Sequence, residues 1–132
     1  MALITFDDSK KRDVVLIGRV TLDFNPNELN RTLDKVETFS MYLGGSPGNM
    51  AVGINKLGKK VGFIGCVSND QFGDFVLNYF NERNIDTSQM VRAKNGERIG
   101  LTFTEIKSPT ESSILMYRDC VADLQIAPED VD

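Results

Sequence analysis

Two short apolar runs constrain the fold of this chain more than any other feature. The first lies within Asp13–Gly18 and the second within Lys60–Val67. Neither run alternates with polar residues, so each predicts a strand that is buried on both faces. Such strands belong to parallel sheets whose two faces are covered by helices. The runs therefore predict an α/β fold.

Two amphipathic segments supply the expected helices. One follows the glycine cluster Gly44–Gly48 and is expected to end at Gly58, since glycine favours helix termination. The other is expected to begin at a cap formed by Asn69 or Asp70 and to end at Asn84. The expected core-facing residues are Met50, Ala51, Ile54 and Leu57 in the first helix and Phe72, Val76, Tyr79 and Phe80 in the second.

The remaining segments change in character. Arg19–Thr38 is polar and is expected to begin as a loop, after which Phe39–Leu43 alternates as a half-exposed strand does. Further along, Ile99–Phe103 alternates, Ser108–Thr110 has the composition of a turn, and Ser113–Arg118 is expected to be another strand. We expect these strands to be antiparallel, either at the edge of the main sheet or in a small separate sheet.

The charge balance and the missing residue types exclude several classes of function. A net charge of −4 disfavours nucleic acids and anionic membranes, which attract excess Lys and Arg. The absence of His removes His-dependent triads and most zinc sites. No apolar run approaches the roughly 18 residues of a membrane span. The acidic N-terminal stretch does not resemble a signal peptide, so we expect a cytoplasmic protein in which Cys66 and Cys120 are buried thiols.

The glycine cluster Gly44–Gly48 is the strongest local signal. Glycines beside a helix start let a ligand approach the backbone, where the amides carry partial positive charge. On the glycines alone, a tight strand-to-helix turn is the favoured interpretation. The cluster lacks the G-x-G-x-x-G spacing of dinucleotide-binding folds and the lysine of a Walker A loop.

Three polar residues are further candidates, and each has a structural alternative. Asp23 is expected in a loop beyond the first strand, where it binds a ligand or makes a local turn. Asn49 is expected to open the first helix, and its amide suits either a sugar hydroxyl or the helix cap. Arg118 suits a carboxylate or phosphate. For Arg118, as for Arg31 and Arg98, a solvated surface position is the alternative.

One series of motifs covers most of the chain: Gly18–Asp23, Gly44–Ala51, Leu57–Gly73 and Asn84–Thr87. In this order and spacing they resemble the N-terminal half of the ribokinase (PfkB) family of carbohydrate kinases. The second motif has the family's Gly-Gly pair, followed by Asn49. The last departs from the pattern, because Asn84 stands where the family has glycine.

The resemblance implies a ribokinase-like, three-layer α/β/α fold with a small β-sheet lid, of which residues 1–132 form the N-terminal, substrate-binding part. The lid strands would lie around 33–43 and 90–118, with Met90–Arg92 and Ile99–Ile106 among them. The ATP-binding C-terminal half of the family is absent from these residues. A homodimer formed through the lid is a further expectation.

The resemblance also implies the reaction, transfer of the γ-phosphoryl group of ATP, with Mg²⁺, to a sugar or sugar acid. The expected substrate is 5-dehydro-2-deoxy-D-gluconate, with 2-keto-3-deoxygluconate or fructose as alternatives. The residues expected to bind the substrate are Asp23, Gly44, Gly45 and Asn49 at its hydroxyls and Arg118 at a carboxylate.

The family's catalytic aspartate and its Gly-Ala-Gly-Asp motif have no counterpart here, so the resemblance implies a catalytic base beyond Asp132. We therefore assign no catalytic residue and no metal site to this chain, and we expect it to be inactive alone. The alternative from another class is a non-catalytic sugar-binding module.

Overall fold

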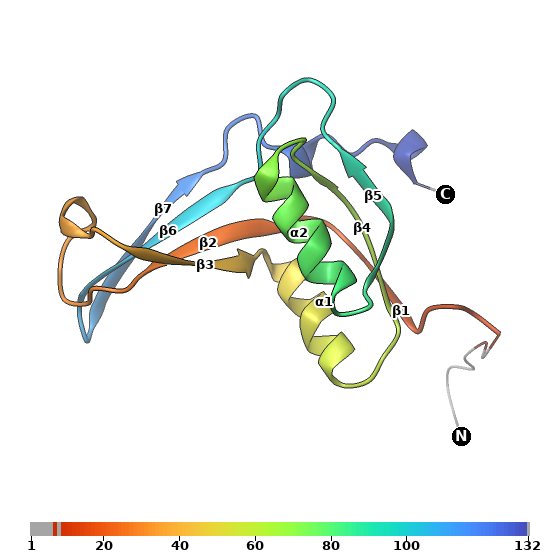
Figure 1. Ribbon diagram of the computed structural model, residues 1–132, viewed down its shortest axis with the longest axis horizontal. Helices are drawn as coiled ribbons and strands as arrows, with labels where there is room; N and C mark the ends of the chain where they lie inside the picture. The colour runs from red at the N-terminus through yellow and green to blue at the C-terminus, as the bar shows by residue number, and fades with distance from the viewer. Residues whose placement is uncertain (1–6, 8, 132) are drawn as a thin grey trace.

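The computed structural model describes residue 7 and residues 9–131, and within them the chain forms two sheets and two α-helices (Figure 1). The first sheet has three parallel strands in the order β1-β4-β5. These strands are β1 (Val14–Ile17), β4 (Val61–Val67) and β5 (Asp86–Arg92), and the helices are α1 (Ser46–Lys56) and α2 (Gln71–Asn81). The expected α/β fold is confirmed.

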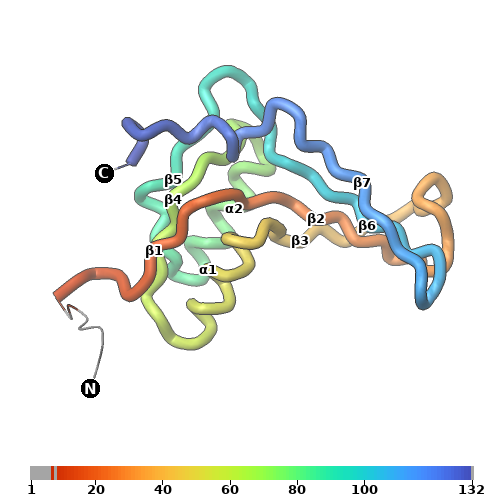
Figure 2. The backbone as a smooth tube through the Cα atoms, turned by 180° about the vertical axis from the view of Figure 1, so that it is seen from behind, coloured from red at the N-terminus to blue at the C-terminus, as the bar shows by residue number. Residues whose placement is uncertain are grey.

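The helices α1 and α2 lie on the same face of the parallel sheet, as the views from the two sides show (Figures 1 and 2). Between them and β4 lies the core, in which the rings of Phe63 and Phe80 are 5.1 Å apart. The fully buried aliphatic residues Val61, Val67, Val76 and Ile85 surround these rings. Val15 and Ile17 of β1 are 49% and 61% exposed. The second helical layer of a three-layer fold is thus not among the described residues.

Helix α2 begins at the cap expected from the sequence. Asp70 Oδ1 accepts hydrogen bonds from the backbone amides of Phe72, at 3.0 Å, and Gly73, at 3.1 Å. Burial acts to raise the pKa of Asp70, but the hydrogen bonds from the Ser68 hydroxyl and these two amides lower it below its ordinary value. The cap therefore works best as a carboxylate.

The second sheet has four strands in the order β3-β2-β6-β7 and extends away from the helices (Figure 1). Its strands are β2 (Thr21–Pro26), β3 (Phe39–Gly44), β6 (Leu101–Ser108) and β7 (Glu111–Tyr117). The outer pairs are antiparallel, as expected, and the central pair β2/β6 is parallel.

The expectation of a loop at the start of Arg19–Thr38 is wrong, because this stretch contains β2. Leu22 is fully buried and Phe24 packs against the core, whereas the residues between and beside them are polar. This alternation is that of a half-buried strand, and the polar composition and Pro26 obscure it.

The assignment of Met90–Arg92 to the second sheet is also wrong. These residues end β5, where they pair in parallel with Gly65, Cys66 and Val67 of β4. Of the segment 33–43, Leu33–Lys35 forms a short 3₁₀ turn, η1, and the strand begins at Phe39.

Three smaller expectations differ as well. Cys66 is buried, but Cys120 is exposed. In α1, Ala51 is buried and Ile54 packs against the core as expected, but Met50 and Leu57 are 48% and 81% exposed, and Gly48 and Val52 are buried in their place. The helix also starts earlier than expected, at Ser46. After β7 the described chain ends in two 3₁₀ turns, η2 (Ala122–Leu124) and η3 (Pro128–Asp130).

Neither helix in the described part of the chain has the length and apolar character needed to cross a membrane.

Candidate functional site

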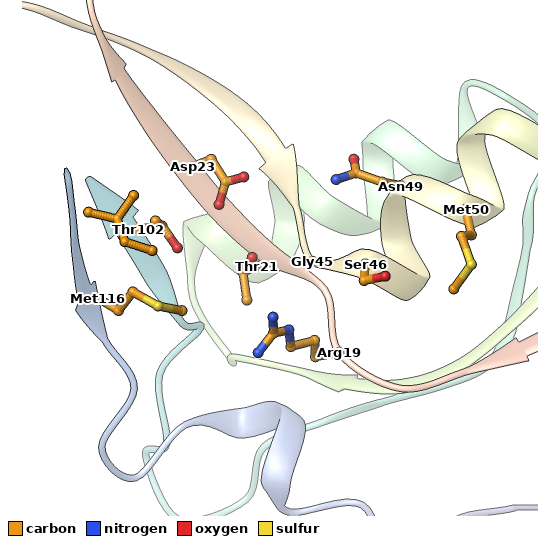
Figure 3. A pocket seen from close by; sticks show the side chains of 10 residues that line it. Arg19, Thr21, Asp23, Gly45, Ser46, Asn49, Met50, Thr102 and Met116 are labelled. Atoms are coloured by element: carbon orange, nitrogen blue, oxygen red, sulfur yellow. The ribbon is translucent and has the colours of Figure 1, made fainter. Parts of the chain in front are cut away.

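A cleft of about 610 Å³ lies where the second sheet meets the start of α1 (Figure 3). Strand β2 and the residues just before it form its floor, the first turns of α1 form one side, and β6 and β7 contribute the other. The lining residues are Arg19, Thr21, Asp23, Gly45, Ser46, Asn49, Met50, Thr102, Ile114 and Met116. Three of the five residues expected to bind substrate, Asp23, Gly45 and Asn49, are therefore brought together here.

Asp23 lies within β2 rather than in the expected loop. It is directly opposite Tyr42 of β3 on one side and Thr102 of β6 on the other. Strand alternation places its half-buried side chain on the cleft side of the sheet, with Thr21. Among the described residues, no hydrogen bond or ion pair engages its carboxylate. The carboxylate is thus free to accept hydrogen bonds from a ligand.

Gly44 does not line the cleft, but it makes room for Asp23. A Cβ atom at Gly44 would lie within 2.6 Å of Asp23 Oδ2 and closer still to Oδ1. The carboxylate therefore occupies the space that any larger residue at position 44 would need. Gly44 therefore affects the site by determining where the Asp23 carboxylate can lie.

Gly45 shapes the junction between β3 and α1. It is the residue before the helix and has a φ of 86°, in the region that favours glycine. A Cβ at this position would lie 2.8 Å from the carbonyl oxygen of Arg19. Gly45 thus allows the start of α1 to pack closely against the segment that leads into β2.

Asn49 is the fourth residue of α1 and does not cap it. Its backbone amide donates to the carbonyl oxygen of Gly45 at 2.9 Å, and its exposed side chain points towards the strand that carries Asp23 (Figure 3). The earlier helix start, at Ser46, accounts for this difference. The Ser46 and Gly48 amides have no partner four residues back and add partial positive charge beside the cleft.

Arg19 is a cleft residue that the sequence motifs did not indicate as a ligand-binding position. It is exposed, lines the cleft and forms no ion pair or hydrogen bond within the described part of the chain. The signal that could have identified it is the spacing of Arg19, Thr21 and Asp23. Residues two apart in an extended chain lie on the same side.

Arg118 is not among the cleft residues. Its guanidinium donates to both carboxylate oxygens of Asp123, at 2.9 and 2.8 Å. The side chain of Asp123 is only 3% exposed, so the pair anchors η2 to the end of β7. Arg98 lies in a separate hollow with Asp70 and Tyr117, and Arg31 contacts the carbonyl oxygen of Lys35 at 3.5 Å.

Within residue 7 and residues 9–131, no group of three or more His, Cys, Asp or Glu side chains is placed to hold a metal ion. The cleft itself contains one carboxylate, one guanidinium, and the hydroxyl and amide groups of Thr21, Ser46, Thr102 and Asn49. This set can hold a polyhydroxylated ligand by hydrogen bonds.

The described residues do not test the expected position of the catalytic base. Asp132, beyond which the base is expected, itself lies outside the described residues. Asp23 is the one carboxylate that lines the cleft. The resemblance assigns it to substrate binding, not to the role of the base. The assignment of the base beyond Asp132 therefore stays a prediction.

The chain is similar to known proteins over nearly its whole length. Residues 11–132 match the pfkB family carbohydrate kinases. The chain is 63% identical over 131 residues to a 5-dehydro-2-deoxygluconokinase of Clostridium tetani; the match covers 99% of this chain and 39% of that relative. The chain therefore spans about two fifths of the relative's length.

Two solved structures show the same fold. A sugar kinase of Pyrococcus horikoshii in complex with ATP matches 89% of this chain and 38% of its own, with 30% identity and a TM-score of 0.80. A fructokinase of Xylella fastidiosa matches 90% of this chain and 37% of its own, with 29% identity and a TM-score of 0.80.

Proposed function

This chain belongs to the pfkB family of carbohydrate kinases, and we propose from this premise that it supplies the sugar-binding part of a kinase for 5-dehydro-2-deoxy-D-gluconate. The reaction is transfer of the γ-phosphoryl group of ATP to a hydroxyl group of this sugar acid. Phosphoryl transfer depends mainly on positioning the acceptor and neutralising charge. The role of this chain is to position the acceptor.

The observation that carries the proposal is the unengaged carboxylate of Asp23 in the cleft, with Asn49 facing it. A carboxylate can accept hydrogen bonds from two neighbouring hydroxyls, and an amide can both donate and accept. A sugar presents such hydroxyls on adjacent carbons. Gly44 and Gly45 keep the backbone of the site close to these side chains.

The substrate is inferred from the relatives. The relative with 63% identity is a 5-dehydro-2-deoxygluconokinase, and this similarity extends over nearly the whole chain. The similarity to a fructokinase structure, at 29% identity, is weaker. We therefore favour the sugar acid, place the reaction in myo-inositol catabolism, and keep 2-keto-3-deoxygluconate and fructose as alternative substrates.

ATP and Mg²⁺ are expected to bind mainly in the portion of the relatives that this chain does not span. The Pyrococcus horikoshii sugar kinase, which has the same fold in this region, is in complex with ATP. The described residues that line the cleft include one carboxylate and no lysine, which suits a sugar better than a triphosphate. The catalytic base is likewise expected beyond Asp132, in a cytoplasmic enzyme.

The test is a chimaera in which this chain replaces the matching residues of the Clostridium tetani relative. Coupled ADP release is measured with 5-dehydro-2-deoxygluconate, 2-keto-3-deoxygluconate, fructose and ribose. We expect activity with the first compound and none from the 132-residue chain alone. A folded chimaera that binds these sugars but releases no ADP would favour the non-catalytic sugar-binding module.

We also propose a homodimer formed through the second sheet. The side of this sheet away from the cleft carries an aromatic cluster, in which Phe103 lies 5.1 Å from Phe24, 5.7 Å from Phe39 and 5.6 Å from Tyr117 between ring centroids. On β7, Leu115 and Tyr117 are 43% and 57% exposed. A second copy would cover this apolar surface with an identical one.

A further inference from the structure

We propose that Arg19 selects an acidic substrate by pairing its guanidinium with the carboxylate of the bound sugar acid. This inference rests on the proposed function and adds to it the residue that recognises the acid group of the substrate. Arg19 lines the same cleft as Asp23 and Asn49. Figure 3 shows Arg19 and Asp23 on either side of Thr21, so the positive and negative groups lie at different parts of the cleft.

The charges of the cleft fit this role. Arg19 and Asp23 are the ionisable side chains among the lining residues. The chain as a whole carries a net charge of −4. Without Arg19, an acidic sugar would meet an uncompensated carboxylate at Asp23 and be repelled. With Arg19, the hydroxyls can lie towards Asp23 while the acid group lies towards the guanidinium.

Arg19 is also available, whereas three other arginines of the chain are engaged. Arg12, Arg92 and Arg118 form ion pairs with Asp86, Asp74 and Asp123, respectively. Arg19 has no such partner within the described part of the chain, although Asp23 lines the same cleft. Its planar fork matches the two oxygens of a carboxylate. The free guanidinium is therefore suited to a ligand.

The backbone at Arg19 is held in place by its neighbours. A Cβ on Gly18 would lie 2.8 Å from Pro47 Cγ, and a Cβ on Gly45 would lie 2.8 Å from the carbonyl oxygen of Arg19. The start of α1 therefore packs closely against this segment. Because the backbone at Arg19 is held in place, less conformational entropy is lost when the side chain pairs with a ligand.

The experiment is isothermal titration calorimetry with the full 132-residue chain. The ligands are 5-dehydro-2-deoxygluconate and 2-keto-3-deoxygluconate, which are acids, and fructose, which is neutral. The variants are Arg19→Ala, Arg19→Lys and the control Arg31→Ala, which removes an exposed arginine outside the cleft. Circular dichroism verifies that each variant is folded.

We expect Arg19→Ala to bind the acids roughly tenfold to hundredfold more weakly, the range for losing a hydrogen-bonded charge. Arg19→Lys should keep part of the affinity, Arg31→Ala should keep all of it, and fructose binding should be the same in all variants. Unchanged affinity of Arg19→Ala for the acids would overturn the inference and leave the proposed function standing. Failure of the unsubstituted chain to bind any of the three compounds would contradict the proposed function itself.

Discussion

The carboxylate of Asp23 lies over the Cα atom of Gly44, so closely that a Cβ atom there would come within 2.6 Å of Oδ2. The two residues are on adjacent antiparallel strands, because Gly44 pairs with Thr21 and Asp23 pairs with Tyr42. The first glycine of the cluster therefore determines where the carboxylate can lie.

Gly44→Ala is expected to displace the Asp23 carboxylate and weaken sugar binding by roughly tenfold or more, the effect of losing a charged hydrogen bond. Calorimetric titration with 5-dehydro-2-deoxygluconate measures the change. The matched control is Gly53→Ala in α1, where a Cβ would meet no atom within 4 Å. Because alanine favours helix, this control should raise stability by about 0.5–1 kcal/mol and leave binding unchanged. Equal binding by both variants would contradict the assigned role of Gly44.

Asp70→Ala is expected to lower the free energy of unfolding by about 1 kcal/mol, because α2 loses its N-terminal cap. Urea unfolding followed by circular dichroism measures this loss. The cleft does not include Asp70, so sugar affinity should not change. A stability equal to that of the unsubstituted chain would show that the cap contributes nothing.

The Asp70 cap should also make stability depend on pH. Burial opposes ionisation of Asp70, but its hydrogen bonds outweigh burial and lower its folded-state pKa. The stabilisation is therefore present above the unfolded-state pKa of about 3.9 and is lost as the pH falls through the lower folded-state value. The variant Asp70→Asn keeps a capping oxygen without the charge. Across this acidic range, the difference in stability between the unsubstituted chain and Asp70→Asn should shrink; a constant difference would contradict the assignment.

Arg118→Ala is expected to affect stability rather than selectivity. The side chain of Asp123 is 3% exposed, and the substitution leaves its carboxylate buried without its partner. Breaking a buried pair in this way costs about 3 kcal/mol. Thermal and urea unfolding measure the loss, and titration with the acidic and neutral sugars measures selectivity. If Arg118→Ala stayed stable and lost affinity for the acids alone, the acid-binding role would belong to Arg118 and not to Arg19.

The proposed dimer can be tested with two substitutions in strand β7. Leu115→Asp places a charge in the apolar face of β7, whereas Ile114→Asp places the same charge on the neighbouring residue, which lines the cleft on the opposite face. Sedimentation velocity should show that Leu115→Asp is monomeric and that Ile114→Asp stays dimeric. A monomer in the unsubstituted chain at all concentrations would contradict a dimer formed by these residues.

The parts of the fold that the sequence predicted are those in which one local pattern decides the outcome. The unbroken run in Lys60–Val67 marks β4, and Asp70 before an amphipathic segment marks the start of α2. In Thr21–Pro26, Leu22 and Phe24 alternate with polar residues as in a half-buried strand, but Asn25 and Pro26 give the segment the composition of a loop.

Three of the five residues predicted to bind substrate line the cleft, but their arrangement was not predicted. The resemblance indicated Asp23, Gly45 and Asn49, and the structure places all three on one cleft. The role of Gly44 depends on the register of β2 against β3, which no single segment encodes. Similarly, the pairing of Arg118 with Asp123 depends on the path of the chain after β7, which places the two residues together.

The most direct test of the central claim, that this cleft is the sugar site, is a titration of the ¹⁵N-labelled chain with 5-dehydro-2-deoxygluconate followed by two-dimensional NMR. We predict saturable shifts of the Gly45 and Asn49 amides and of the Asn49 side-chain amide, and their loss in Asp23→Ala. Shifts confined to residues away from the cleft, or the same shifts in Asp23→Ala, would contradict the claim.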